Sequence, residues 1–349
     1  MKTNSQTLTR RTFVRRAATV AATAAFGPAI LRAAAAPKYH IRLATIAFEG
    51  TSFHQAIQQL AADWQKLSNG EVKLSIFAGG SMGDEGDVVR KIRNDRLQAG
   101  MLTSVGLAEV DRAITALQLM PIMFRNWEEV DHVREKLRAR LEKTFLDKGF
   151  VMLFWADAGW VRYFSRKPAV TPRDLKPMKV WAMRGDTEGV SLMKDYYQPV
   201  QLNAKDILTS LETGMIDAVP IVPVLANAGQ IVTAAKNMID LKWVPVVGAT
   251  VVQRKVWESI PADLRQRLAE AANQRGALIR AQSRKEDDQA IAAMEKRGLK
   301  VHPVSPAALA EWQAVADDAY PKIRGKIVPA DLFDEVRKLL TEFRATPKA

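Results

Sequence analysis

The sequence predicts an α/β fold made of two similar halves, and three observations lead to this prediction. From residue 39 the chain alternates apolar strand patterns with amphipathic helix patterns, and the same alternation starts again after Gly159. The Ala- and Arg-rich stretch 261–297 then has no proline after its first residue. As a helix it would be about 50 Å long at 1.5 Å per residue, which is more than one small domain needs. We therefore expect two α/β domains and a long helix that runs across both.

The first half starts with strands that are linked by helices. A strand–helix–strand order favours a parallel sheet with right-handed crossovers. The expected elements are strand 39–44, helix 53–67, strand 72–76, a turn at 79–83, helix 87–93, strand 99–105, helix 127–146 and strand 150–155.

The second half repeats this order after Gly159. Its expected elements are strand 178–183, helix 204–212 closed by Gly214, strand 216–224 broken by two prolines, and two helices within 306–343. The expected division is a leader at 1–36, one domain from 37–158 with about 250–297, and a second from 159–249 with about 298–349.

The N-terminus has the features of an export signal. Arg10 and Arg11 form a twin arginine, an apolar segment follows over 17–31, and the small residues 33–36 offer a cleavage site. The apolar segment is shorter than the roughly 20 residues that span a bilayer, which favours a cleaved signal over a signal anchor or a basic amphipathic leader. We therefore expect export by the twin-arginine translocase and a periplasmic location.

The charge balance argues against a nucleic-acid partner. The formal net charge is +13, but six positive charges and no acidic residue precede Pro37, so the rest of the chain carries +7. Its basic residues are interleaved with acids, as in 134–136 and 285–287, and no basic run carries the aromatic residues of a nucleic-acid surface. The chain has no cysteine, which excludes disulfides, a thiolate nucleophile and a Cys-based metal site.

The segment Gly79–Gly83 fits the G-x-S-x-G pattern of a hydrolase nucleophile elbow, with Ser81 as the nucleophile. Such an enzyme also needs an acid, a later histidine and oxyanion donors, and only His132 and His302 follow. The alternative is a tight strand-to-helix turn, which glycines and a small polar residue favour.

No cofactor is expected. The four histidines form no i, i+4 pair and have no acidic partner at ligand spacing, so no metal site is indicated. The glycine turn lacks a following Gly-Lys-Ser/Thr, and the chain has no G-x-G-x-x-G, so a nucleotide site is not indicated either.

The remaining candidates are groups that could bind an organic anion. Arg162 lies in 159–163, and Trp181 and Arg184 lie in 179–186. A guanidinium group can bind a carboxylate through two hydrogen bonds, and aromatic walls exclude competing water. The alternative for each is structural: the arginines could pair with nearby acids, and the tryptophan could belong to the core.

Recognisable motifs occur in this order along the chain: 77–85, 159–162, 167–168, 172–176, 179–181 and 211–218. Together they resemble the dicarboxylate-binding (DctP-type) solute-binding subunits of TRAP transporters, over nearly all of the chain after the leader. The resemblance implies a periplasmic-binding-protein-like fold, with a hinge, a long shared helix and a cleft between two domains. It also implies a membrane permease as partner, and it makes the turn with Gly80 and Ser81 a loop of the cleft.

The sequence departs from this family at two places. Family members commonly carry a carboxylate-binding arginine where this chain has Trp181, and often an asparagine where it has Val222. We therefore expect a more apolar pocket. Either Arg184 or Arg162 binds the carboxylate, or the ligand is a less charged aromatic or hydroxylated acid that stacks on Trp181.

The expected function is binding without catalysis: a small organic acid is captured in the cleft and delivered to TRAP permease subunits. Two alternatives stay open. One is an exported esterase-like hydrolase that uses Ser81. The other is a subunit that presents its ligand to a sensor, which the sequence does not distinguish from a transport subunit.

Overall fold

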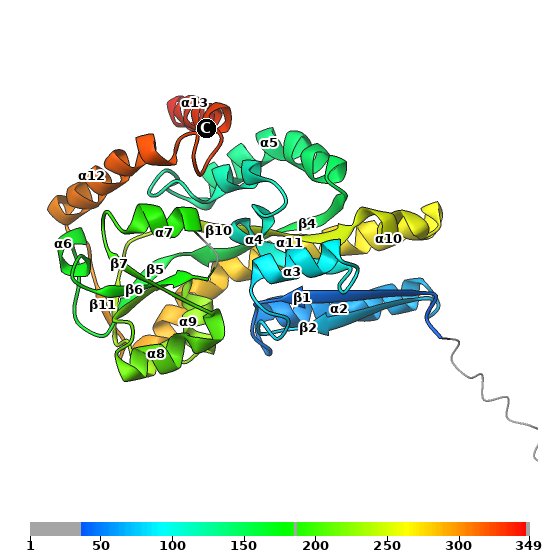
Figure 1. The fold of residues 1–349 in the computed structure, drawn as a ribbon, viewed down its shortest axis with the longest axis horizontal. Coiled ribbons are helices and arrows are strands. Elements are labelled where there is room, and N and C mark those ends of the chain that lie inside the picture. The colour runs from blue at the N-terminus through cyan, green and yellow to red at the C-terminus, as the bar shows by residue number, and fades with distance from the viewer. Residues whose placement is uncertain (1–35, 185–186, 347–349) are drawn as a thin grey trace, which may run out of the picture. The chain divides into compact units, whose positions relative to one another are not determined.

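The structure, a computed structural model, describes residues 36–184 and 187–346. The expected signal peptide, apart from Ala36, lies outside these residues. From Pro37 on, the described chain forms two mixed β-sheets with helices packed around them (Figure 1). None of the helices in these two ranges is long and apolar enough to cross a membrane.

The first sheet has five strands in the order β2-β1-β3-β10-β4. β1 pairs in parallel with β2 and β3, as expected, whereas β10 is antiparallel to both β3 and β4. β10 comes from far along the chain and separates two strands of the first half, so the sheet is mixed and not purely parallel. The strands are β1 (Tyr39–Thr45), β2 (Val72–Phe77), β3 (Ala99–Thr103), β4 (Phe150–Trp160) and β10 (Pro245–Gln253).

Helices cover both faces of the first sheet because each presents an apolar face to it. One core contains Ile57 and Trp64 of α2, and a second core contains Val89 of α3 and Leu137 of α5. Side-chain caps fix two helix starts: Thr51 accepts a hydrogen bond from His54 N, and Asn126 accepts one from Glu129 N. These helices are α2 (Ser52–Leu67), α3 (Glu85–Arg93), α4 (Ser104–Leu107), the 3₁₀ turn η1 (Arg112–Leu117), α5 (Trp127–Asp147) and α10 (Arg254–Ser259).

The second sheet has six strands in the order β11-β9-β5-β8-β6-β7. β6 is parallel to β7 and β8, and β5 runs antiparallel between β8 and β9. The strands are β5 (Arg162–Ser165), β6 (Lys179–Met183), β7 (Gln198–Leu202), β8 (Ala218–Ile221), β9 (Asn237–Ile239) and β11 (Lys300–His302). The helices around it are α6 (Pro172–Leu175), α7 (Thr187–Met193), η2 (Ala204–Asp206), α8 (Ile207–Thr213), α9 (Pro223–Ala228) and η3 (Ile231–Thr233).

Short crossing segments connect the two sheets. β4 passes into β5 through Val161 alone, and β9 passes into β10 through residues 240–244. The two segments pair with each other: Val161 N donates to Val244 O at 2.9 Å, and Trp243 N donates to Val161 O at 3.1 Å. The expected long helix, α11 (Ala262–Glu295), contacts α2 and β4 of the first half and α9 of the second. The prediction of a long shared helix is therefore confirmed.

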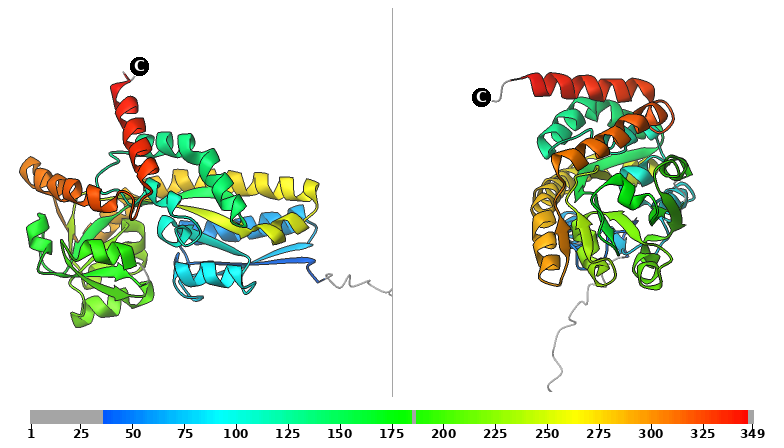
Figure 2. Two further views of the ribbon diagram at one scale, coloured as in Figure 1. Left: turned by 45° about the horizontal axis from the view of Figure 1, so that its top comes forward. Right: turned by 90° about the vertical axis from the view of Figure 1, so that its left-hand side faces the viewer.

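The two C-terminal helices pack on different halves of the molecule. α12 (Pro306–Ile323) contacts α6 and α7 of the second half, whereas α13 (Ala330–Ala345) packs on α5 of the first (Figures 1 and 2). We expected all of 298–349 to lie with the second half. The difference arises because Phe333, Val336 and Leu340 of α13 join the same core as Leu137. Residues 245–249, also expected in the second half, are part of β10 and lie in the first sheet.

Candidate ligand-binding cleft

A cavity of about 250 Å³ lies between the two sheets, at the carboxyl ends of β1, β3, β6 and β8. Ligands of α/β proteins commonly bind at this end of a sheet, where loops diverge from the strands. The lining is mostly apolar and comes from both sheets and from α9. The lining residues include Ile46, Ala47, Phe48, Phe53, Met101, Leu102, Ala158, Val161, Trp181, Met183, Met193, Ile207, Ile221, Val222, Leu225 and Val246.

Two residues that we expected at a ligand site, Trp181 and Val222, are part of this lining. The Trp181 indole Nε1 donates to the carbonyl oxygen of Leu202 at 3.1 Å, so the ring is held against β7 and its polar atom is already satisfied. Only 9% of Trp181 and 2% of Val222 is exposed. Both side chains therefore present apolar surface, and neither offers a polar group to a ligand.

The cavity has few polar groups with free hydrogen-bonding capacity. Gln118 Oε1 accepts from Val247 N at 3.1 Å, which leaves its Nε2 without a protein partner among the described residues. The Thr45 hydroxyl oxygen accepts from Ala47 N at 3.2 Å and keeps its own hydrogen to donate. The cavity can thus offer a ligand two uncharged donors.

Glu85 lies beneath the cavity at the start of α3 and is almost fully buried. Three donors face its carboxyl group: Thr103 N at 2.7 Å, Thr103 Oγ1 at 2.5 Å and Gly106 N at 3.1 Å. A Cβ at Gly106 would lie 2.4 Å from the Glu85 Cβ, so this close approach requires glycine. Burial raises the pKa of Glu85, with the three hydrogen bonds opposing the shift.

Asp157, near the end of β4, also borders the cavity, but its charge is neutralised by two arginines, Arg134 and Arg284. Its side chain is fully buried and accepts from Arg134 Nη1 at 2.6 Å and from Arg284 Nη2 at 2.5 Å. Asp131 pairs with the same two arginines, and the Arg284 guanidinium lies 4.8 Å from the ring centre of Trp127. This ionic cluster joins β4, α5 and α11 and leaves Asp157 no free oxygen.

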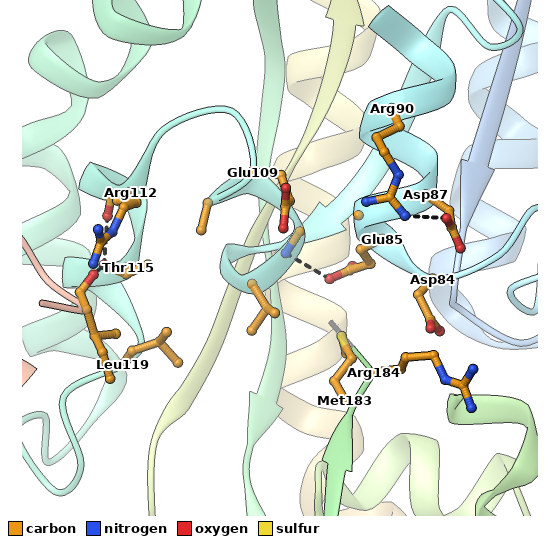
Figure 3. Close-up of a pocket in the computed structure, with 15 residues that line it drawn as sticks. Asp84, Glu85, Asp87, Arg90, Glu109, Arg112, Thr115, Leu119, Met183 and Arg184 are labelled. Carbon is orange, nitrogen blue, oxygen red and sulfur yellow. Dashed lines mark hydrogen bonds and ion pairs between the residues drawn. The ribbon is translucent and has the colours of Figure 1, made fainter. Parts of the chain in front are cut away.

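A second cavity, of about 450 Å³, shares Glu85, Val105 and Met183 with the first. We call it the polar cavity because its lining, unlike that of the first, contains several arginines and acidic residues. Figure 3 shows Arg90 paired with Asp87, and Arg184 next to Met183. Arg184 is exposed, and the structure places it in this polar cavity. The pKa of Asp84 is raised by partial burial and by Asp87, while Arg184 acts against this shift.

Arg162 lies outside both cavities. The preceding residue, Val161, lines the apolar cavity, and Arg162 interacts instead with Asp287 of α11 and with Asp240, whose Oδ1 is 3.6 Å from its Nε. Its Nε and Nη1 are buried without a hydrogen-bond partner, and burial lowers the pKa of its guanidinium.

Gly80 and Ser81 also lie outside both cavities, in the turn between β2 and α3. Gly80 has a φ of 71°, a conformation that favours glycine, and its N–H donates to Thr45 O at 3.1 Å. The turn therefore supports the loop after β1. Of the six expected residues, Trp181 and Val222 line the apolar cavity and Arg184 lines the polar cavity, whereas Arg162, Gly80 and Ser81 line neither.

The structure gives Ser81 no catalytic partner among the described residues. Each histidine faces another group: His40 pairs with Ser75 at 2.8 Å, His302 with Asn237 at 2.9 Å, His132 packs on Phe343, and His54 accepts from Gly50 N. Across 36–184 and 187–346, no three His, Asp or Glu side chains are arranged to hold a metal ion.

Sequence reasoning missed the polar residues of the cleft, among them Thr45, Glu85, Gln118 and Asp157. Glu85 ends the motif 77–85 and could have been considered on that ground. Gln118 and Asp157 lie in segments with no recognisable pattern, and only the fold brings them to the cavity.

Comparison with protein families gives a match over most of the chain. The model for the DctP family, described as bacterial extracellular solute-binding protein, family 7, matches residues 43–326. A solute-binding protein of Albidiferax ferrireducens is 24% identical over 277 residues, which are 77% of this chain and 80% of the relative. The 2,3-diketo-L-gulonate-binding periplasmic protein YiaO of Escherichia coli is 23% identical over 254 residues, or 72% of this chain and 76% of YiaO.

Solved structures share the fold. A TRAP periplasmic solute-binding protein of Shewanella oneidensis with bound succinate superposes with a TM-score of 0.81 and 18% identity, covering 87% of this chain and 100% of the other. One from Ralstonia eutropha with bound (S)-2-acetolactate gives a TM-score of 0.80 and 19% identity, covering 87% and 99%. The prediction of a two-domain binding-protein fold is confirmed by these matches.

Proposed function

The chain belongs to the bacterial extracellular solute-binding proteins of family 7, and from this membership we propose that it captures a small organic acid in the cleft and delivers it to TRAP permease subunits. The observation that carries the proposal is the cavity between the two sheets, at the carboxyl ends of their strands. The ligands named for similar proteins are succinate, (S)-2-acetolactate and 2,3-diketo-L-gulonate, all organic acids.

Capture would proceed by closure of the two halves around the ligand. The single residue between β4 and β5 and the short segment 240–244 are the natural hinge, because few backbone torsions there can turn one sheet against the other. A ligand drives such a change only by binding the closed form more tightly than the open one. The permease would then accept the closed, loaded form.

The location and the export route are further parts of the proposal. The twin arginine at 10–11 and the apolar segment 17–31 support export by the twin-arginine translocase into the periplasm. A ligand-presenting sensor subunit would share these features. Uptake of the ligand by cells that have or lack the permease genes separates the two roles.

We propose that no chemistry accompanies binding. Ser81 lies in an exposed turn outside both cavities and has no histidine partner among the described residues. Replacement Ser81→Ala should leave ligand binding unchanged. Hydrolysis of a 4-nitrophenyl ester that is abolished by Ser81→Ala would instead establish the esterase alternative.

A thermal-shift screen against mono- and dicarboxylates, aromatic acids, amino acids and neutral sugars tests the proposal. At a ligand concentration of 100 Kd, binding should stabilise the protein by about 2.7 kcal/mol, which gives a clear rise in Tm. At least one organic acid should produce it, and Trp181→Ala should weaken it. A panel in which sugars or amino acids alone raise the Tm would contradict the proposed ligand class.

A further inference from the structure

We infer that the ligand is an acid with a single charge and a bulky apolar body, bound with the body inside the apolar cavity and the carboxylate at the mouth, next to the polar cavity. This inference rests on the proposed function and names its substrate class. A ligand of this kind differs from small dicarboxylates and sugar acids, because those acids carry polar groups over their whole length.

The charges around the apolar cavity favour a ligand with a single carboxylate. Among the described residues that line the apolar cavity there is no arginine, lysine or histidine, although two carboxyl groups, those of Glu85 and Asp157, border it. Moving a carboxylate out of water into an apolar site is strongly unfavourable unless a cation or several donors compensate. The arginines next to Asp157 are already engaged by two acids. A second carboxylate deep in this cavity would thus have no counter-charge.

The size and the surface of the cavity fit a bulky apolar body. An apolar cavity of about 150 Å³ is large enough to bind benzene, and this one measures about 250 Å³. Its walls include the indole of Trp181 and the side chains of Val222 and Leu225. A ring or a branched chain would bury its apolar surface against these walls, which favours binding. Gln118 Nε2 and the Thr45 hydroxyl could serve one hydroxyl or keto oxygen on that body.

The junction of the two cavities can hold the carboxylate. Glu85, Met183 and Val105 line both cavities, so the two spaces adjoin. The Glu85 carboxyl group at this junction is engaged by donors of Thr103 and Gly106. On the polar side Arg184 follows Met183 directly at the end of β6 and is exposed to solvent (Figure 3). A carboxylate at this junction would stay partly hydrated and would lie near a guanidinium, so it would avoid the cost of full burial. Since Arg184 is exposed, its contribution should be modest.

Isothermal titration calorimetry of the purified protein provides the test. The apolar acids are phenylacetate, 4-hydroxybenzoate and 4-methyl-2-oxopentanoate, and the polar acids are succinate, L-malate and D-galacturonate. Phenylacetamide is the uncharged match for phenylacetate. We expect at least one apolar acid to bind at least tenfold more tightly than every polar acid.

Variants test where the apolar body and the carboxylate of the ligand lie. Trp181→Arg should reverse the preference by placing a cation inside the cavity, so that succinate gains affinity and the apolar acid loses it. If Trp181→Arg does not fold, Leu225→Arg on the partly exposed wall from α9 serves the same purpose, with Leu278→Arg on an exposed leucine as the control. Arg184→Ala should weaken the apolar acid roughly two- to fivefold and leave phenylacetamide unchanged, whereas Arg93→Ala, outside both cavities, should affect neither.

The outcomes distinguish failure of the inferred ligand class from failure of the proposed function. If a polar acid binds as tightly as or more tightly than every apolar acid, the protein is still a carboxylate receptor and the inference is overturned. If none of the six acids binds, the proposed function fails and the inference fails with it. An equal loss of acid and amide in Arg184→Ala would overturn the placement of the carboxylate.

Discussion

Gly159, the penultimate residue of β4, is the residue at which the crossing strand meets the long helix. Its φ is 119°, and a Cβ there would lie 2.4 Å from Asp287 Oδ1 of α11. The next residue, Trp160, donates its N–H to Asp287 Oδ2 at 2.8 Å. The crossing therefore depends on a close backbone approach that only glycine allows.

We predict that Gly159→Ala destabilises the protein markedly. Gly149→Ala is the matched control, because Gly149 also has a positive φ, of 84°, but a Cβ there would contact nothing within 4 Å. Gly149→Ala should lower the free energy of unfolding by about 1 kcal/mol through backbone strain. Gly159→Ala should lower it by about 1–3 kcal/mol more, because the new Cβ also clashes with Asp287. Urea denaturation measures both. Equal losses in the two variants would show that the contact with Asp287 does not constrain the crossing.

Asp287 itself predicts a pH dependence. Burial raises its pKa to about 6, while the Trp160 N–H and the charges of Arg162 and Lys242 act against the shift and Asp288 adds to it. A carboxyl group with a raised pKa in the folded state stabilises the fold at low pH, and this contribution is lost as pH rises from about 4 to about 6.

The free energy of unfolding of the wild type, minus that of Asp287→Asn, should therefore fall by up to about 3 kcal/mol over this range. Denaturation series at pH 4, 5, 6 and 7 measure it. The prediction fails if the difference between the two proteins is independent of pH.

For single residues, the sequence predicted which positions belong to the cleft better than it predicted where their side chains point. Trp181 and Val222 could be placed in the cleft because they occupy positions where the resembling family has polar ligand-binding groups. Arg162 could not be placed, because its direction depends on the alternation of side chains through the crossing: Val161 faces the cavity, so Arg162 faces α11. A shift of one residue in that segment would have reversed the result.

Among the elements, β4, α5 and α11 are held together by the cluster of Asp157, Asp131, Arg134 and Arg284. The side chain of Asp157 is completely buried and that of Arg134 is 4% exposed. Breaking a buried ion pair by removing one partner leaves the other charge uncompensated in a medium of low polarity.

Asp157→Asn should accordingly destabilise the protein by about 3 kcal/mol. Asp147→Asn removes one partner of the exposed pair with Lys143 and should change stability by no more than about 0.5 kcal/mol. Guanidinium chloride is unsuitable for this comparison because it screens charges, so urea should be used. A loss for Asp157→Asn as small as that of the control would mean that the cluster contributes little to joining the three elements.

Most elements with strong periodicity were predictable, including α2, α5, α11 and the first three strands. β10 was not, although Pro245–Gln253 is almost entirely apolar. A continuous apolar run carries no alternation, and nothing local indicates that it pairs antiparallel between β3 and β4. The packing of α13 on α5 likewise depends on distant apolar partners.

For the whole molecule, closure at the hinge predicts that the protein becomes more compact when it binds its ligand. Val161 and residues 240–244 are the short connections about which the two halves would turn, so the unliganded protein should sample more open forms. Small-angle X-ray scattering should show a smaller radius of gyration with a saturating acid than without it. An unchanged radius, with calorimetry showing that the acid is bound, would contradict closure.

The most direct test of the central claim, that this protein binds an organic acid in its cleft without converting it, combines calorimetry with recovery of the ligand. We expect saturable binding of an apolar monocarboxylate at about one per chain, its loss or severe weakening in Trp181→Arg, and recovery of the chemically unchanged acid by proton NMR. Binding that is unaffected by Trp181→Arg, or an acid recovered as a product, would contradict it.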